Sequence, residues 1–300
     1  METPPVRRHP FRSMGTSVEL IAGEDADEAV FDAAARRVRG IFEREDHRCS
    51  RFRDDSEITL VNRRAGRPTR LSRDLAVVVA GARQGAARGG GRFDPTVLDA
   101  VVAAGYDRDL DEVLAGARGA LHPPRPCGRW RDVALERRVL RLPEGIGLDL
   151  GGIAKGWTVD LAAEAALEAG LPWAVVNAGG DLRMVGSPAA GLDVRIEDPE
   201  DPDDEVLRLV LSGGAIATSS ITRRAWGPGL HHLIDPSTGA PASTGILQAT
   251  VWAPTCAEAE VDAKDALLLG EPALERVSAV LVTADARILT NMTERAAEAA

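Results

Sequence analysis

The spacing of apolar and polar residues divides the chain into short strands and amphipathic helices. Alternation or short apolar runs predict strands at 17–21, 173–177, 182–185, 192–196, 206–211 and 279–282. Helical spacing predicts a helix to about residue 47 after Asp25 or Asp27, a short helix through 62 after Asp54, Asp55 or Ser56, and helices at 72–88 and, after Thr255, at 257–268. The pattern at 132–142 indicates a hairpin. We expect irregular surface loops at 107–129 and along the acidic run 197–205.

The segment 147–158 combines an apolar run, a set of glycines and the start of a helical pattern, and indicates a strand, a glycine turn and a helix. Glycines let backbone N–H groups approach a ligand, and a helix N-terminus beside Lys155 favours a phosphate. The spacing matches neither a P-loop nor a dinucleotide fingerprint. A tight structural turn and a ligand loop both remain open. Asp149 favours the ligand loop, because a carboxylate among apolar residues needs a partner.

Two other turns carry carboxylates. The first spans 92–97, where Arg-Phe-Asp-Pro-Thr-Val follows three glycines and Pro95 restricts the turn. We expect this loop to close over a ligand and not to join the core; a plain helix-to-helix loop is the alternative. The second turn follows Asn177, where two glycines and Asp181 repeat the arrangement at Asp149. Two such strand ends can face one ligand from neighbouring positions in a sheet.

Two pairs of polar residues have simpler interpretations than a metal site. His231 and His232 are consecutive, and consecutive strand residues point to opposite faces, which disfavours one ion bound by both. Glu260 and Lys264 lie one helical turn apart, the spacing of a surface ion pair.

Composition excludes several classes of protein. Thirty-six basic and 46 acidic residues give a net charge of -10 without a basic stripe, so nucleic acid is not an expected partner. The first residues lack the apolar core of a signal peptide and a cysteine for a lipid, and no apolar run has the length of a membrane span. We therefore expect a cytoplasmic protein. The widely spaced Cys49, Cys127 and Cys256 are expected to be free thiols.

Seven short motifs in one order resemble those of the ApbE-type flavin transferases, bacterial enzymes that use FAD to attach FMN to a target protein. The resemblance covers about 14–270 and rests on Met14-Gly15-Thr16, Ser56-Glu57 with Asn62, Phe93 to Val97, Asp149 with Gly151 to Gly156, Asn177 with Gly179 to Asp181, Ala217 to Ser219, and His232 with Asp235 to Pro241. It implies a mixed α/β (α+β) fold in a single domain over 1–300, with flexible ends at 1–12 and 288–300. The FAD site would lie between two halves of the chain.

The resemblance also implies roles for individual residues. The implied FAD contacts are Met14, Arg92, Phe93, Asp94, Asp149, Lys155 and Ile234. A Mg²⁺ site would take the backbone carbonyl of Gly152 and the side chain of Glu260. The residues expected to take part in catalysis are Asp149, Glu260 and Lys264.

The implied reaction is attack by a Thr or Ser hydroxyl of an acceptor protein on the FMN-side phosphorus of FAD, with release of AMP. A metal and backbone donors would stabilise the diphosphate charge. Where the family usually has Ala-Asp and, four residues after the Asp, Thr, this chain has Ala259-Glu260 and Lys264. A protonated lysine has no lone pair for a metal. Either its ammonium replaces part of the metal's charge or the activity is altered.

Three functions therefore remain open on the sequence alone. The first is an FAD-dependent FMN transferase acting on an acceptor protein. The second is a protein that binds FAD or hydrolyses it to FMN and AMP, and the third is a nucleotide-binding protein unrelated to flavins. Residues 235–241 are similar to an acceptor sequence, Asp-x-x-Thr-Gly-Ala followed by a hydroxyl residue, but Pro241 takes the hydroxyl position. We expect no self-modification there.

Overall fold

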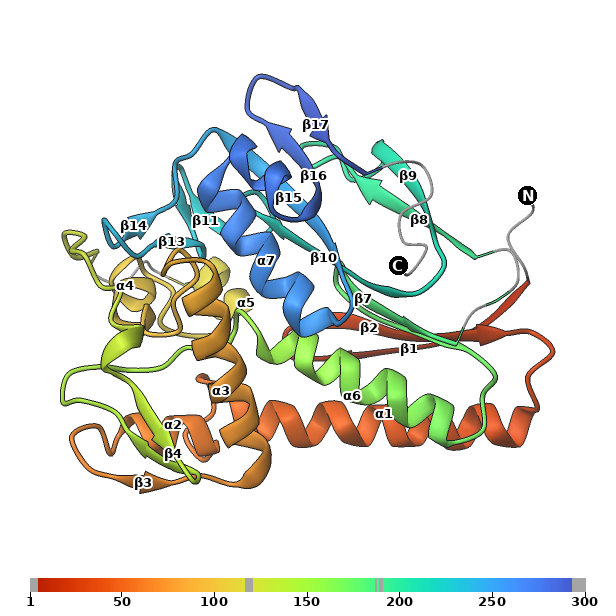
Figure 1. Cartoon of the computed structure of the whole chain (residues 1–300), viewed down its shortest axis with the longest axis horizontal. Helices are drawn as coiled ribbons and strands as arrows, with labels where there is room; N and C mark the ends of the chain where they lie inside the picture. Colours follow the sequence, from red (N-terminus) through yellow and green to blue (C-terminus); the bar gives the residue numbers. More distant parts are fainter. Residues whose placement is uncertain (1–4, 117–120, 187, 189–190, 293–300) are drawn as a thin grey trace.

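A computed structural model describes residues 5–116, 121–186, 188 and 191–292. Its largest element is an eight-stranded sheet in which each strand runs antiparallel to its neighbours (Figure 1). The strands, in spatial order, are β1 (Val6–Ser13), β2 (Thr16–Gly23), β6 (Ala174–Ala178), β7 (Asp181–Val185), β10 (Gly214–Ser220), β15 (Ile246–Ala253), β16 (Ser278–Thr283) and β17 (Ile288–Thr290).

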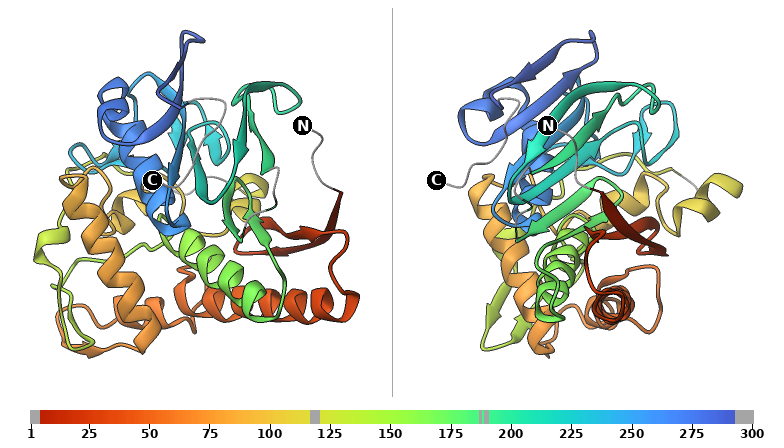
Figure 2. Two further views of the ribbon diagram at one scale, coloured as in Figure 1. Left: turned by 45° about the vertical axis from the view of Figure 1, so that its right-hand side comes forward. Right: turned by 90° about the vertical axis from the view of Figure 1, so that its right-hand side faces the viewer.

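Helices cover one face of this sheet and a hairpin covers the other. On the first face lie α1 (Glu28–Cys49), α6 (Ala154–Glu168) and α7 (Cys256–Leu269), with α1 and α6 side by side (Figures 1 and 2). On the second face lies the hairpin of β8 (Leu192–Glu197) and β9 (Glu205–Leu211). Strand β6 is buried on both faces, because Val176 packs in the helical core while Val175 packs against β8 and β9. The mixed α/β fold class is confirmed.

A smaller part of the chain builds a second core beside the sheet. It consists of α2 (Glu57–Asn62), α3 (Arg73–Arg88) and a three-stranded sheet of β3 (Thr69–Arg70), β5 (Val139–Arg141) and β4 (Ala134–Glu136). Leu148, Leu150 and Ile153 fill this core. Val261 also packs in it, from helix α7, which covers the larger sheet. The loop that enters α6 therefore lies where the two cores meet.

Short elements complete the described chain. They are α4 (Leu98–Ala103), α5 (Leu110–Ala115), β11 (Ala225–Gly227), β12 (Leu230–His231), β13 (Ile234–Asp235), β14 (Ala240–Pro241) and the 3₁₀ turns Trp130–Asp132 and Glu271–Glu275. No helix in the described part of the chain is both long and apolar enough to cross a bilayer. The three cysteines are free thiols, as expected.

Helix starts follow the predicted caps. Asp27, Ser56 and Ser72 each accept a backbone N–H three residues ahead, at 3.0, 3.1 and 3.2 Å. At α7 the Thr255 hydroxyl accepts from the Glu258 N–H at 3.3 Å and donates to the Glu258 carboxylate at 2.9 Å. Asp160 of α6 also accepts from the N–H groups of Cys256 and Ala257, so a buried carboxylate of one helix holds the N-terminus of the next.

Several expectations are corrected. Flexible ends were expected at 1–12 and 288–300, but 6–12 and 288–290 lie in β1 and β17, while 1–4 and 293–300 are outside the described residues. Strand β1 carries charged residues on its exposed side and a single buried side chain, Phe11, so its sequence lacks a strong apolar alternation. Helix α5 lies within the predicted loop 107–129, and α4, β10, β15 and β17 were not predicted.

The run before the glycine turn is also not a strand. Leu148 lies in no strand, and its backbone pairs with a side chain: Asn62 Nδ2 donates to its carbonyl at 2.9 Å and Asn62 Oδ1 accepts its N–H at 2.8 Å. The amide of Asn62 thus takes the place of a neighbouring strand. This explains how a buried apolar segment reaches the start of α6 without joining a sheet.

Candidate active site

A cavity of 390 Å³ opens where the two cores meet, and we call it the central cavity. It is lined from both halves of the chain, by the β1–β2 turn, the segments 46–53 and 92–111, the loop before α6, the segment 232–234 and α7. The predicted residues that it brings together are Met14, Arg92, Phe93, Asp94, Asp149, Gly152, Lys155, Ile234 and Lys264. Glu260 lies outside this lining and lines an adjoining groove.

Met14 reaches the cavity because it sits in a tight hairpin turn. Ser13 pairs with Thr16, so the β1–β2 connection is Met14 and Gly15 alone. Their φ angles are 51° and 67°, the left-handed conformation of a two-residue type I′ turn. Methionine adopts this conformation at a cost, since only glycine reaches it freely. The strained position places Met14 on the cavity wall.

Asp149 has the partner that its apolar surroundings require. Its Oδ2 lies 3.1 Å from Arg51 Nε, and its Oδ1 accepts the Gly151 N–H at 2.8 Å. Arg51 donates to the carbonyl of Tyr106 at 2.8 Å and lies over the Tyr106 ring at 4.6 Å. Arg51 and Tyr106 were missed from the sequence. The isolated carboxylate at Asp149 was the only signal that pointed to a basic partner.

The loop at 92–97 belongs to the core, which corrects the expectation of a mobile cover. Phe93 packs in the second core and is 6% exposed, while Asp94 is 3% exposed. Asp94 Oδ1 accepts from the N–H and hydroxyl of Thr96 at 2.8 and 2.6 Å, and Oδ2 accepts from Trp130 N–H at 3.2 Å. Arg92 pairs with Asp265 of α7 at 2.9 and 3.1 Å. The loop therefore fixes one cavity wall.

Replacement of Asp94 by Ala should consequently destabilise the ligand-free protein. Buried donors at Thr96 and Trp130 would lose their acceptor, which costs about 2–3 kcal/mol of the free energy of unfolding. Chemical denaturation of the ligand-free variant measures this loss. An unchanged midpoint, accompanied by weaker FAD binding, would instead support a loop that acts on the ligand alone.

The second glycine turn is a hairpin that positions a carboxylate. Gly179 and Gly180 connect β6 and β7 with φ of 63° and 96°, again a type I′ turn. A Cβ at Gly179 would lie 2.0 Å from the Thr16 hydroxyl, so a side chain has no room there. The turn brings Asp181, which is 1% exposed, into an ion pair with Lys155. These glycines form a turn of the sheet that also lines the sheet groove, so a role in facing a ligand stays a prediction.

Lys155 stands in the first turn of α6 and is buried. Burial lowers the pKa of Lys155 to about 8, with the charge of Glu260 opposing this shift and that of Arg224 adding to it. The ammonium therefore lies near the midpoint of its titration at mildly alkaline pH. Its position at a helix N-terminus adds to the local positive potential.

Glu260 and Lys264 form the expected ion pair, but it is buried. Glu260 Oε1 lies 3.3 Å from Lys264 Nζ, and Oε2 accepts the Gly156 N–H at 2.8 Å. Lys264 Nζ also donates to the Glu260 carbonyl at 3.2 Å. Burial acts to raise the pKa of Glu260, but Lys264 and Lys155 outweigh it and hold this pKa below its ordinary value. The carboxylate is ionised and both of its oxygens are engaged.

These residues do not fit the expected Mg²⁺ site. Mg²⁺ requires oxygen ligands in near-octahedral order, and an ammonium supplies none. A Cβ built on Gly152 would lie 3.1 Å from Lys264 Cε, so the lysine stem fills the space beside the expected carbonyl ligand. In the described part of the chain, no group of three or more His, Cys, Asp and Glu residues is arranged to hold a metal ion. Gly152 and Glu260 as metal ligands therefore stay a prediction, against which the position of the Lys264 ammonium argues.

The two histidines have different environments. His231 Nε2 lies 3.1 Å from the Ala242 carbonyl and its Nδ1 accepts the Leu233 N–H at 3.3 Å, so this ring is a structural link. His232 is hydrogen-bonded to the backbone of Arg224, and burial lowers its pKa well below the ordinary value. Its Nδ1 is buried without a hydrogen-bond partner among the described residues. His232 thus presents a neutral imidazole with an available lone pair.

A groove of 880 Å³ adjoins the central cavity along β2, β6, β7, β8 and β10, and we call it the sheet groove. The residues that line both hollows are Gly15, Leu110, Gly151, Lys155, Arg224, His232 and Lys264. We call this shared lining the junction. Three of its side chains are cationic and one is the neutral imidazole, so the junction is suited to a dianion held between two larger groups.

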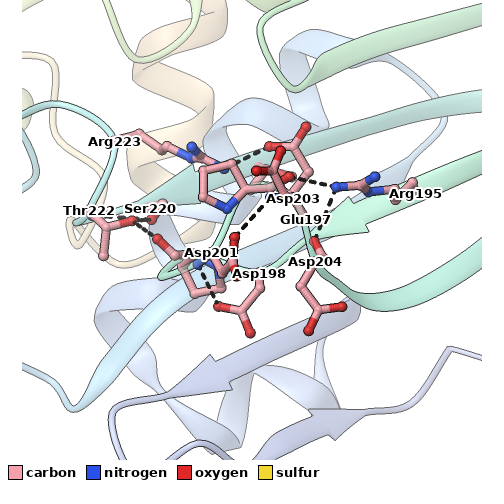
Figure 3. Close-up of polar contacts among 12 residues, drawn as sticks. Arg195, Glu197, Asp198, Asp201, Asp203, Asp204, Ser220, Thr222 and Arg223 are labelled. Atoms are coloured by element: carbon pink, nitrogen blue, oxygen red, sulfur yellow. Dashed lines mark hydrogen bonds and ion pairs between the residues drawn. The ribbon is translucent and has the colours of Figure 1, made fainter.

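The acidic loop 198–204 directly follows Glu197, which lines the sheet groove. Arg223 Nη2 binds Glu197 at 2.7 Å, and the Thr222 hydroxyl donates to the Pro199 carbonyl at 2.8 Å (Figure 3). Residues 200–204 are exposed, as expected of a solvated loop, whereas Pro199 is buried. The loop is thus fastened to the segment that leads into the junction.

Comparison with known proteins decides the family. The model of the ApbE family matches residues 14–285. The chain belongs to this family. It is 27% identical over 268 residues to an FAD:protein FMN transferase of Vibrio cholerae, covering 86% of this chain and 80% of that protein. It is 28% identical over 261 residues to an FAD:protein FMN transferase of Treponema pallidum, covering 79% and 72%.

Solved structures of ApbE proteins share the fold. The ApbE protein of Thermotoga maritima aligns with a TM-score of 0.82 at 22% identity over 95% of this chain and 96% of that one. The flavin transferase ApbE of Vibrio cholerae aligns with a TM-score of 0.76 at 23% identity over 93% and 94%. The family model extends beyond the predicted limit of residue 270, because it includes β16. The recognition of an ApbE protein from its motifs is confirmed.

Proposed function

We propose that this protein transfers FMN from FAD to a Thr or Ser hydroxyl of an acceptor protein and releases AMP. The observation that carries the proposal is the junction, where Lys155, Arg224 and Lys264 meet between two hollows. FAD is two large groups joined by a diphosphate, so its charge matches the junction and its two ends match the hollows. Cations and a helix N-terminus supply the charge stabilisation that phosphoryl transfer requires.

The chain's own residues account for each step of the transfer. The acceptor oxygen forms a bond to the FMN-side phosphorus, and the bond from that phosphorus to the oxygen of AMP breaks. The hydroxyl proton passes to His232 Nδ1, whose lone pair is available. The negative diphosphate raises the basicity of this imidazole when FAD binds. AMP leaves with the bridging oxygen, and His232 then releases its proton to solvent.

The sheet groove gives the acceptor a route to the phosphorus. It extends from the junction over β2, β6, β7, β8 and β10, and its lining includes Thr218 and Thr250, whose hydroxyls are hydrogen-bonded to each other at 2.9 Å. Asp149 and Arg51 lie on the opposite side of the junction, in the central cavity. FAD is anchored from the central-cavity side, and the acceptor approaches along the wider sheet groove beside the end of FAD that lies there.

Comparison of FAD with its fragments tests whether one ligand uses both hollows. FAD should bind more tightly than FMN or AMP in titrations followed by flavin absorbance and by calorimetry, because only FAD fills both hollows at once. ADP binding as tight as FAD binding would point to a nucleotide protein unrelated to flavins. Free FMN accumulating from FAD without an acceptor would indicate a hydrolase.

FAD affinity should also fall as the pH rises through about 8. Lys155 has its pKa lowered to about 8, and only its protonated form attracts the diphosphate. Below this pH the ammonium is present and binding is unaffected; above it, affinity decreases by at most tenfold per pH unit. Calorimetric titrations between neutral and alkaline pH check this, with Lys155→Met as the control that should show a flatter profile. Equal profiles for the two proteins would exclude Lys155 as the titrating group.

A further inference from the structure

The two lysines of the junction are the only lysines in the chain. Of its 36 basic residues, Lys155 and Lys264 alone are lysine and all others are arginine. Both line the central cavity and the sheet groove, with side chains 13% and 14% exposed. Arginine presents a broad planar fork, whereas lysine presents a compact charge that fits beside a close-packed backbone. The two lysine ammonium groups of the chain therefore both lie at the junction.

The stem of Lys264 fixes that compact charge between two structural anchors. It passes over Gly152, where an added Cβ would lie 3.1 Å from Cε and 3.2 Å from Cδ. Its Nζ is held by the Glu260 side chain and carbonyl. Phe93 borders Gly152 from the other side, 2.8 Å from the same added Cβ. The Lys264 ammonium is thus already ordered at the wall of the junction, so ligand binding does not have to supply the conformational entropy of ordering it.

Each ammonium is held by a buried carboxylate that is itself anchored. Glu260 accepts the Gly156 N–H, and Asp181 lies at the start of β7 beside the hairpin turn. The pairs compensate the charge of each lysine in the free protein. Arg224 adds a third cation from the segment that precedes β11. A bound dianion then faces three cations, two of them paired with carboxylates, and their remaining positive charge provides part of the electrostatic role that a divalent ion otherwise fills.

We propose that Lys264, together with Lys155, replaces a divalent cation at the FAD diphosphate, so that FMN transfer by this protein does not require Mg²⁺. This inference rests on the proposed function and concerns the same site. The ammonium groups neutralise the diphosphate oxygens, while bond formation, loss of AMP and proton transfer to His232 proceed as described above. Fixed charges act as general electrostatic stabilisers without a coordination shell.

FAD binding under metal control gives the first test. The unaltered protein should bind FAD with the same dissociation constant in a chelator and in millimolar Mg²⁺. Lys264→Met keeps the stem and removes the charge, and should weaken binding by about 10- to 100-fold in both conditions, the range for losing a charged hydrogen bond. If this variant misfolds with Glu260 unpaired, Glu260→Gln with Lys264→Met removes both charges while Gln still accepts the Gly156 N–H.

Two further variants complete the test. Arg88→Ala removes a cation that pairs with Asp262 of α7 at 2.9 Å and lines neither hollow, and should leave FAD binding unchanged. Glu260→Asp with Lys264→Thr restores oxygen ligands in place of the ammonium, and should make both FAD binding and AMP release dependent on Mg²⁺. Retention of metal-independent binding by this double variant would show that Lys264 does not stand in for the ion.

Chemical labelling gives a readout separate from activity. Amine-reactive acylation followed by peptide mass spectrometry reports on both junction lysines individually. FAD should slow the acylation of Lys155 and Lys264 in chelator as strongly as in Mg²⁺. Protection and transfer that occur only with Mg²⁺ would overturn the metal-free site while leaving the proposed function intact. Absence of FAD binding in every condition would reject both.

Discussion

Replacement of His232 by Ala is expected to slow FMN transfer by about 100- to 10,000-fold, the contribution of a positioned general base. The structure places a half-buried neutral imidazole at the junction, with an Nδ1 that has no hydrogen-bond partner among the described residues. Below about pH 8, no other described side chain at the junction is both neutral and able to accept a proton, because its other polar side chains are Arg224, Lys264 and Lys155, whose pKa is about 8. FAD affinity should change little, so the effect falls on the rate of transfer at saturating FAD.

The neighbouring histidine supplies the matched control. His231→Gln disturbs the links to Ala242 and Leu233, so it should lower stability while the remaining folded protein transfers FMN at a normal rate. The pH profile of single-turnover transfer adds a second criterion. The rate for the unaltered protein should fall toward acid pH as His232 becomes protonated, and this fall should be absent in His232→Ala. Normal transfer by His232→Ala would place the base elsewhere, on the acceptor or in solvent.

Replacement of Asp149 by Ala is expected to weaken FAD binding by about 10- to 150-fold, which corresponds to about 1.5–3 kcal/mol for a hydrogen bond to a charged group. Asp149 lines the central cavity, holds the glycine loop through Gly151 and pairs with Arg51. Its loss removes an acceptor for the ligand and leaves the Arg51 guanidinium unpaired. Equilibrium titration with FAD measures the change.

Asp149→Asn separates the two contributions. Asparagine keeps an acceptor for the Gly151 N–H but not the charge opposite Arg51, so it should weaken binding less than alanine does. Asp54→Ala, at a carboxylate whose side chain is 94% exposed, serves as the control for loss of one negative charge. A folded Asp149→Ala protein with the dissociation constant of the unaltered protein would exclude Asp149 from the FAD site.

Local signals predicted much of the secondary structure. Capping residues located the starts of α1, α2, α3 and α7. A capping side chain bonds a backbone N–H only three residues ahead, so the signal lies within one short stretch of sequence. Apolar alternation or short apolar runs located β2, β6, β7, β8, β9 and β16, because this signal is also local in the sequence. Edge strand β1 was missed because one of its faces is exposed to solvent and carries charged residues, which weakens the apolar pattern. The segment at Leu148 was misassigned because its backbone pairs with the side chain of Asn62, which is distant in the sequence, and not with a strand.

The candidate site was only partly predictable. Motif order brought together residues from Met14 to Lys264, and nearly all of them line one cavity. The same motifs could not show that Asp94 is buried under its own hydrogen bonds, since burial depends on packing of the whole chain. Arg51 and Arg224 were missed as contributors because an arginine in a loop has no distinctive spacing. Their roles come from the tertiary fold alone.

The most direct test of the proposed function is mass spectrometry of an acceptor after incubation with this protein, FAD and Mg²⁺. A domain carrying the Asp-x-x-Thr-Gly-Ala-Thr sequence that the family resemblance implies provides the acceptor, and its Thr→Val form at the final position provides the control. We predict that the acceptor gains the mass of FMN, that AMP appears in equal amount, and that the control remains unmodified. Unmodified acceptor, with FAD intact or released as free FMN, would contradict it.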